Sequence, residues 1–203
     1  MTGQEGRMHW NGHETWYSVV GDLGSPKTPV VICHGGPGAA HDYTEPIAEL
    51  STFGRACVLY DQLGCGKSEH LPDAAADFWT PQLFKDELVA LTERHTVVGQ
   101  SWGGMLAMEY ALDHPAGLKG MVVADSPASI SLWVSEANRL RADLPPDVQE
   151  TLTRHEEAGT TDTPEYEAAV RSSTTATSVA CRGRTASSAA STRSTRTRPS
   201  TTR

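Results

Sequence analysis

The pentapeptide Gly-Gln-Ser-Trp-Gly at residues 99–103 constrains the fold more than any other feature of this chain. Residues 95–98, directly before it, form a short and mostly β-branched segment, which is typical of a buried parallel strand. After it, Met105, Met108 and Leu112 recur at spacings of three and four residues, which predicts a helix with these side chains on its buried face. The sequence therefore predicts a strand and a helix joined by a tight, glycine-flanked turn.

Ser101 stands at the centre of this turn, where its side chain is expected to point clear of the backbone. A serine in this context can act as a nucleophile, and the glycines two residues to either side leave room for the neighbouring strand and helix. A purely structural glycine-rich turn is the alternative interpretation. We take Ser101 as the candidate catalytic nucleophile.

Apolar segments alternate with helical patterns along residues 1–126. Short strands are predicted at residues 16–20, 29–33, 56–60 and 120–124, and helices at residues 43–50 and 82–93. This alternation predicts an α/β fold with a parallel sheet covered on both faces, whose ligands bind beyond the carboxyl ends of the strands. Three glycine-rich motifs follow predicted strands, at residues 34–38, 61–68 and 99–104, so we expect them to meet at one edge of the sheet.

The first two of these motifs have distinct expected roles. Serine hydrolysis needs N–H donors for the negative oxygen of its intermediate, and losing one donor costs about 10²–10³ in rate. Gly36 in the first motif is one candidate donor and the N–H of Trp102 is the second, with a plain strand-exit turn as the alternative. The second motif is not a phosphate-binding loop, because Asp61 stands where that loop requires glycine, and we expect it to shape the site.

Beyond Asp125 the pattern changes to helices without strands. Residues 131–144, 146–157 and 164–170 read as short helices. We interpret residues 1–126 as the N-terminal part of the α/β core and residues 127–170 as the start of a helical cap over the sheet edge.

The three glycine-rich motifs together resemble those of a known family. His34-Gly-Gly-Pro-Gly38, Asp61-Gln62-x-Gly64-x-Gly66-x-Ser68 and Gly99-Gln100-Ser101-Trp102-Gly103-Gly104 look like the proline iminopeptidase family of α/β-hydrolases and its amino acid amidase relatives. The resemblance covers roughly residues 15–170. It implies an α/β-hydrolase fold with a helical cap, no metal and no organic cofactor. The implied activity is release of an N-terminal proline or another residue from peptides or amides.

The resemblance also assigns roles to individual residues. It makes Ser101 the nucleophile and the backbone N–H groups of Gly36 and Trp102 the oxyanion donors. The expected substrate-binding residues are His34, Gly35 and Gln100. A small peptide or an amino acid amide is the expected partner, and an amidase or esterase acting on amino acid derivatives is the alternative enzyme.

The histidine base and the acid of a serine triad are not apparent. α/β-Hydrolases order their triad as Ser, then Asp or Glu, then His, and the resemblance places both late residues beyond the cap. Here the last histidine is His155, and no carboxylate follows Glu167. Asp125 is a further candidate for the acid. We expect a chain truncated within or just after its cap, with little or no peptidase activity, because losing the base costs orders of magnitude in rate.

Residues 171–203 form a tail that is rich in Ser, Thr and Arg and contains no Asp or Glu. Such a segment cannot bury enough apolar surface to fold, so we expect it to be disordered. A reading-frame slip near Arg171 is the favoured hypothesis, because codons read one base earlier can encode a mixed, amphipathic sequence. A natural basic arm that binds nucleic acid, on a non-catalytic remnant, is the alternative.

Charge and cysteine content restrict the location and partners of the chain. The net charge is -8, with every acidic residue in the first 170, so nucleic acid is not an expected partner of the body. No apolar run reaches the roughly 20 residues that span a bilayer, and the N-terminus lacks the pattern of a signal peptide. The four cysteines, Cys33, Cys57, Cys65 and Cys181, lack metal-ligand spacing. We expect free thiols and a cytoplasmic protein.

Overall fold

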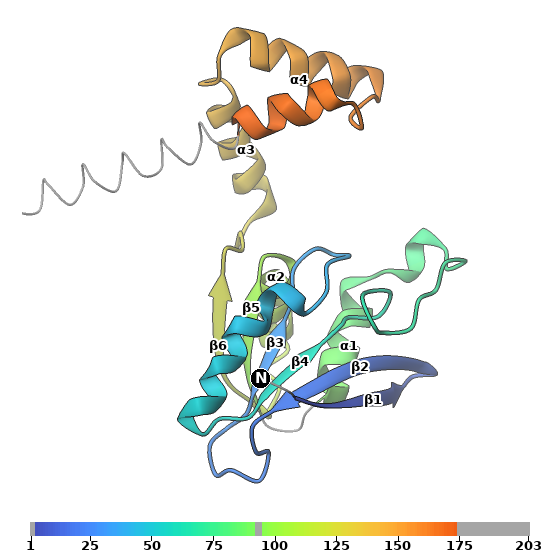
Figure 1. The fold of residues 1–203 in the computed structure, drawn as a ribbon, viewed down its shortest axis with the longest axis vertical. Helices are drawn as coiled ribbons and strands as arrows, with labels where there is room; N and C mark the ends of the chain where they lie inside the picture. The colour runs from blue at the N-terminus through green and yellow to red at the C-terminus, as the bar shows by residue number, and fades with distance from the viewer. Residues whose placement is uncertain (1–2, 92–94, 174–203) are drawn as a thin grey trace, which may run out of the picture. The chain divides into compact units, whose positions relative to one another are not determined.

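The computed structural model describes residues 3–91 and 95–173, which divide into two compact units, the second beginning at Ser129. The first unit is a six-stranded sheet with helices on both faces (Figure 1). Its strands are β1 (Gln4–Trp10), β2 (His13–Val20), β3 (Val30–Cys33), β4 (Cys57–Tyr60), β5 (His95–Gln100) and β6 (Leu118–Ala124). Its helices are the 3-10 helices η1 (Asp42–Phe53) and η2 (Ala76–Phe78), and the α-helices α1 (Pro81–Leu91) and α2 (Trp102–Leu112).

The strand order is β1-β2-β4-β3-β5-β6, and β4, β3, β5 and β6 run parallel. The three glycine-rich motifs follow β3, β4 and β5, so they meet at the carboxyl edge of the sheet as predicted. Two strands depart from the predicted parallel arrangement, because β2 runs antiparallel to β4 and β1 antiparallel to β2. Asn11 and Gly12 have φ angles of 46° and 83°, and this Asn-Gly turn is the two-residue loop of the hairpin between β1 and β2. The hairpin is not among the predicted elements.

Side chains of the parallel strands alternate between the two faces of the sheet. On one face the strands pack against α1 and α2, in a cluster formed by Val31, Cys33, Val58, Tyr60, Leu88, Val97, Ala107 and Tyr110. On the other face they pack against η1, in a cluster formed by Val20, Val30, Ile32, Ala48, Cys57, Leu59 and Val98. Burial on both faces explains why these strands read as continuous apolar runs.

The buried face of α2 differs from the predicted one. Leu106, Ala107 and Tyr110 are buried, whereas Leu112 is 69% exposed. The predicted apolar stripe was therefore wrong, although the helix itself begins and ends as expected. The helix is apolar over most of its circumference, so spacing alone does not select a face. The turn before α2 sets the direction in which the helix enters, and this decides which side meets the sheet.

Glu87 is a fully buried carboxyl group in the middle of α1, and it was not expected there. Its Oε1 accepts hydrogen bonds from the Thr15 hydroxyl of β2 and from the Leu63 N–H, the latter at 2.9 Å. Its Oε2 has no partner among the described residues. Burial raises the pKa of Glu87 from 4.5 to about 7, against the opposing effect of the two hydrogen bonds.

Stability should therefore depend on pH through Glu87. Its folded pKa lies above the unfolded value, so the folded state loses stability as pH rises from about 4.5 to about 7, by about 3 kcal/mol in all. Glu87→Gln keeps Oε1 as the acceptor and removes the charge. In urea unfolding at a series of pH values, we expect Glu87→Gln to be the more stable protein above pH 7 and to lose most of that advantage below pH 4.5. Parallel pH profiles for the two proteins would contradict this assignment.

The second unit contains the helices α3 (Ile130–Arg141) and α4 (Pro146–Ala158), and residues 164–173 are also helical. This agrees with the three predicted helices. The side chain of Ser129 caps α3 by accepting from the Leu132 N–H, and Leu144, Leu152 and Ala169 form a small core. The predicted tail begins inside the last helix, and residues 174–203 lie outside the described residues. Within the described ranges, no helix is both long enough and apolar enough to cross a bilayer.

Candidate active site

Ser101 occupies a strained turn between β5 and α2. Its φ and ψ angles are 54° and -118°, a region that a residue with a side chain rarely adopts. The Ser101 N–H donates to the carbonyl of Ala124 at 2.9 Å, which ties the turn to the end of β6. This geometry confirms the predicted turn and places a serine where a nucleophile elbow would present it.

Two glycines of the pentapeptide allow this turn because backbone packs on backbone there. A Cβ atom on Gly99 would lie 2.2 Å from the carbonyl oxygen of Gly103. A Cβ on Gly103 would lie 2.2 Å from the carbonyl oxygen of Cys33, at the end of β3. The start of α2 therefore approaches β3 more closely than any side chain permits, and this brings Ser101 beside the loop that follows β3.

Gly35 of that loop lies directly against Ser101. A Cβ on Gly35 would be 3.0 Å from the Ser101 Cβ and 2.8 Å from both Gln100 Oε1 and Tyr43 Oη. The Gly35 N–H donates to the Tyr43 hydroxyl, which in turn donates to Gln100 Oε1 at 2.7 Å. The loop that was expected to supply an oxyanion donor is thus held beside the candidate nucleophile. Tyr43 was expected only as a helix residue, and no sequence signal marked it.

Gly36 and His34 complete this loop. Gly36 has a φ of 119°, which only glycine adopts readily, and it precedes the cis peptide bond to Pro37. His34 is fully buried, and burial lowers the pKa of its imidazole. Its Nε2 accepts from the Gln62 N–H at 2.9 Å, and its Nδ1–H donates to the Gly35 carbonyl at 2.8 Å. Both ring nitrogens are therefore occupied in shaping the loop.

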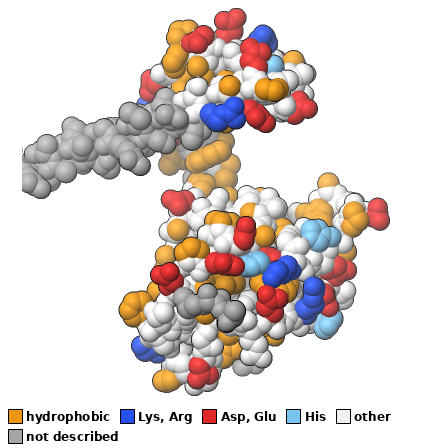
Figure 2. Space-filling model, viewed as in Figure 1, with side chains coloured by type: hydrophobic (Ala, Val, Ile, Leu, Met, Phe, Trp, Pro, Cys, Tyr) orange, Lys and Arg blue, Asp and Glu red, His pale blue; other side chains and the backbone are white. Residues whose placement is uncertain are grey.

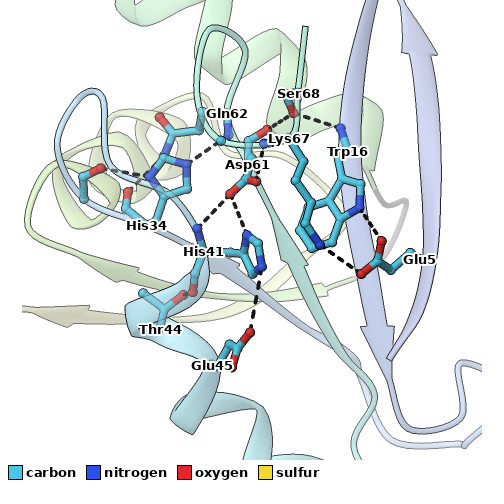
Figure 3. A network of polar contacts seen from close by, with 12 residues as sticks. Glu5, Trp16, His34, His41, Thr44, Glu45, Asp61, Gln62, Lys67 and Ser68 are labelled. Carbon is cyan, nitrogen blue, oxygen red and sulfur yellow. Dashed lines mark hydrogen bonds and ion pairs between the residues drawn. The ribbon is translucent and has the colours of Figure 1, made fainter. Parts of the chain in front are cut away.

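The loop at residues 61–68 is organised around the buried carboxylate of Asp61 (Figure 3). Asp61 accepts from the His41 N–H at 2.7 Å, from the Lys67 N–H at 2.8 Å and from His41 Nδ1 at 2.8 Å. Gly66 has a φ of 49°, and a Cβ there would lie 2.2 Å from Asp61 Oδ2. The glycine pattern of this loop therefore accommodates an internal carboxylate, which explains its likeness to a phosphate-binding loop.

Gln62 connects this loop to the two segments beside Ser101, the glycine-rich loop after β3 and the start of α2. Its Nε2 donates to the His34 carbonyl at 2.9 Å, and its Oε1 accepts from the Trp102 indole Nε1 at 2.8 Å. The Trp102 ring also packs edge-on against Phe84, with centroids 5.8 Å apart. The motif containing Gln62 was recognised in the sequence, but no role was assigned to this residue.

No base for Ser101 is present in the part of the chain that the structure describes. Ser101 Oγ makes no hydrogen bond within the described residues, which include all eight histidines of the chain. His34 and His41 are used in the loops around Ser101, and His155 bonds to Thr160 and Glu165 of the second unit. Asp125, the further candidate for the acid, has a φ of 50° and follows β6.

The cysteines do not compete with Ser101 as nucleophiles. Cys33, Cys57 and Cys65 are buried and free, as predicted, and Cys181 lies outside the described residues. Burial raises the pKa of Cys33 to about 12, which leaves its thiol protonated and unreactive. No cluster of three or more His, Cys, Asp or Glu side chains suited to a metal ion occurs among residues 3–91 and 95–173.

A strained serine at a strand-to-helix elbow, on the carboxyl edge of a largely parallel sheet, defines the α/β-hydrolase class of fold. The chain belongs to the alpha/beta hydrolase fold family, whose model matches residues 28–201. The matched region includes all three glycine-rich motifs and extends beyond the described residues.

Its relatives include curated proline iminopeptidases. The chain is 41% identical over 169 residues to the proline iminopeptidase of Lactobacillus helveticus, a match that covers 80% of this chain and 57% of the relative. It is 37% identical over 172 residues to that of Clostridium botulinum, covering 81% and 58%. The chain therefore spans less than two thirds of the length of these relatives.

Solved structures show the same similarity. The crystal structure of VinJ matches with a TM-score of 0.80 at 50% identity, covering 85% of this chain and 60% of that one. The crystal structure of the proline iminopeptidase of Mycobacterium smegmatis matches with a TM-score of 0.74 at 46% identity, covering 82% and 58%. The predicted fold class and the resemblance to this family are confirmed.

Proposed function

We propose that this chain carries the nucleophile and the oxyanion donors of a serine hydrolase of the proline iminopeptidase type. The contact between Gly35 and Ser101 carries the proposal, because it sets a glycine-rich loop against a serine held clear of the backbone. The 41% identity to a curated proline iminopeptidase supports the substrate class. The substrate is a peptide or amide with an N-terminal proline or a similar residue.

The proposed reaction follows from this geometry. Ser101 Oγ attacks the substrate carbonyl carbon and transfers its proton to a base, while the carbonyl π electrons move to oxygen. The N–H groups of Gly36 and Trp102 hold that oxygen. Collapse of the intermediate breaks the bond to nitrogen, the departing amine takes the proton, and water then releases the acyl group. His34, Gly35 and Gln100 shape the substrate side of the site.

The described residues of this chain do not supply the base that takes the proton of Ser101. We therefore expect the 203-residue protein to hydrolyse prolyl-p-nitroanilide weakly or not at all. Free imidazole in the buffer can take the place of the histidine, so hydrolysis should rise with imidazole concentration. A fast reaction without imidazole would contradict the assignment of a missing base.

Ser101→Ala provides the test of the nucleophile. We expect a fluorophosphonate probe to label the native chain slowly in alkaline buffer, faster with added imidazole, and Ser101→Ala not at all. Mass spectrometry of the labelled peptide locates the modified oxygen. Ser25→Ala, which removes a partly exposed serine that donates to the Gly54 carbonyl, is the matched control and should label like the native protein. Equal labelling of native protein and Ser101→Ala would exclude Ser101 as the nucleophile.

A panel of substrates separates the proposed peptidase from the alternative amidase or esterase. We would compare the hydrolysis rates of prolyl-p-nitroanilide, prolinamide and proline esters in the presence of imidazole. The order of these rates shows which leaving group the site prefers. The nucleic-acid-binding alternative rests on the basic tail, most of which lies outside the described residues.

A further inference from the structure

We propose that Gln62 is a positioning residue that holds both proposed oxyanion donors, Gly36 and Trp102, in place around Ser101. This inference rests on the proposed function, because it assigns those two N–H groups to the oxyanion. Gln62 itself does not touch the reacting atoms. It acts through His34 in the glycine-rich loop and through Trp102 at the start of α2.

The side chain of Gln62 joins the two segments directly. It is fully buried, its Nε2 donates to the His34 carbonyl at 2.9 Å and its Oε1 accepts from Trp102 Nε1 at 2.8 Å. His34 is the first residue of the glycine-rich loop, and Trp102 is the first residue of α2. One planar amide group therefore sets the spacing between the two sides of the proposed oxyanion site.

The glycine-rich loop needs such support. Consecutive glycines restrict the backbone very little, so the conformation of Gly36 at a φ of 119° has to be imposed by surrounding contacts. Asp61, the residue before Gln62, holds the far end of the same segment through the His41 N–H and ring. Two adjacent residues after β4 therefore fix both ends of the segment at residues 34–41 (Figure 3).

The expected effect on rate follows from how strictly oxyanion donors must be placed. Removing one donor costs about 10²–10³ in rate, and misplacing a group by about 1 Å can cost about 10². Gln62→Met keeps the size of the side chain and the backbone N–H bond to His34, and removes the two side-chain bonds. We expect it to slow fluorophosphonate labelling of Ser101, in the presence of imidazole, by about tenfold or more.

A double-mutant cycle tests the route through Trp102. Trp102→Phe keeps the backbone N–H and removes the indole donor to Gln62 Oε1. If the two side chains act through one bond, the double variant should label no more slowly than Gln62→Met alone. Independent, additive losses would overturn the proposal. Trp102→Phe alone still tests the bond should Gln62→Met fail to fold.

Thr15→Val is the matched control for a general loss of stability. Thr15 is also fully buried; its hydroxyl donates to Glu87 and accepts from Trp10 Nε1, and neither bond involves Gln62, His34 or Trp102. It should lower the urea midpoint and leave the labelling rate within about twofold of native. Labelling of Gln62→Met at the native rate, or an equal loss of rate in Thr15→Val, would overturn the positioning role.

A spectroscopic readout separates this inference from the proposed function. If the native chain is labelled no faster than Ser101→Ala, the nucleophile assignment fails. The NMR resonances of the Gly36 and Trp102 backbone amides and of the Trp102 indole then decide the role of Gln62. Large shifts in Gln62→Met and none in Thr15→Val support the positioning role. Unchanged resonances in Gln62→Met overturn it.

Discussion

Gly103→Ala should unfold the elbow, with a loss of about 3 kcal/mol or more in the free energy of unfolding and no labelling of Ser101. In an ordinary helix this substitution would be favourable by roughly 1 kcal/mol. Here the new Cβ would lie 2.2 Å from the carbonyl oxygen of Cys33 and 2.6 Å from that of His34. Both are backbone atoms of the neighbouring strand and loop, so neither can rotate away, and the steric cost exceeds the helical gain.

Gly120→Ala is the matched control for this prediction. Gly120 lies in β6, and among the described residues a Cβ there would meet only Thr96, at 3.6 Å or more. We expect its free energy of unfolding to stay within about 0.5 kcal/mol of native in urea titrations. If Gly103→Ala unfolds cooperatively and with the free energy of unfolding of the native protein, α2 can move away from β3, contrary to the close packing described above.

Asp61→Asn should cost about 3 kcal/mol of stability and loosen the segment at residues 34–41. The buried carboxylate accepts two backbone N–H groups and the His41 ring. An amide of the same shape loses one acceptor oxygen and turns an N–H₂ group toward those donors. Urea unfolding gives the free energy, and hydrogen exchange of the amides in the segment reports the loosening.

Asp22→Asn is the control for the same chemical change at an exposed site. Asp22 Oδ1 accepts from the Gly24 N–H at 2.8 Å, and an asparagine oxygen can replace it there. We expect native stability and native exchange rates in this variant. Equal stability losses in the two variants would mean that the buried hydrogen bonds of Asp61 stabilise the fold no more than the exposed one of Asp22.

The elements flanking Ser101 were predictable because their signals are local. A β-branched segment, a glycine-flanked serine and a helix limited by Pro115 all lie within about 20 residues, and the steric preferences of neighbouring residues decide their conformation. The Asn11-Gly12 hairpin had an equally local signal, so β1 could also have been predicted.

Other features depended on partners that the sequence does not place. Glu87 lies at helical spacing from Leu83 and Phe84 on the buried face of α1, but the partners of its carboxyl group, Thr15 and Leu63, come from elsewhere in the chain. The buried side of α2 was misjudged for a similar reason, because the direction of the elbow decides it. Tyr43, in the first turn of η1, reaches Gly35 and Gln100 only because η1 packs on the sheet.

The sequence by itself determined the α/β architecture and the elbow with Ser101 at its centre, since each rests on periodicity or on the steric limits of a few adjacent residues. Only the tertiary structure decided how the loops around Ser101 are held. Gln62 meets His34 across 28 positions and Trp102 across 40, and Asp61 meets His41 across 20. Contacts over such separations form when the sheet brings strand ends together, so they follow from the order and direction of the strands rather than from local preference.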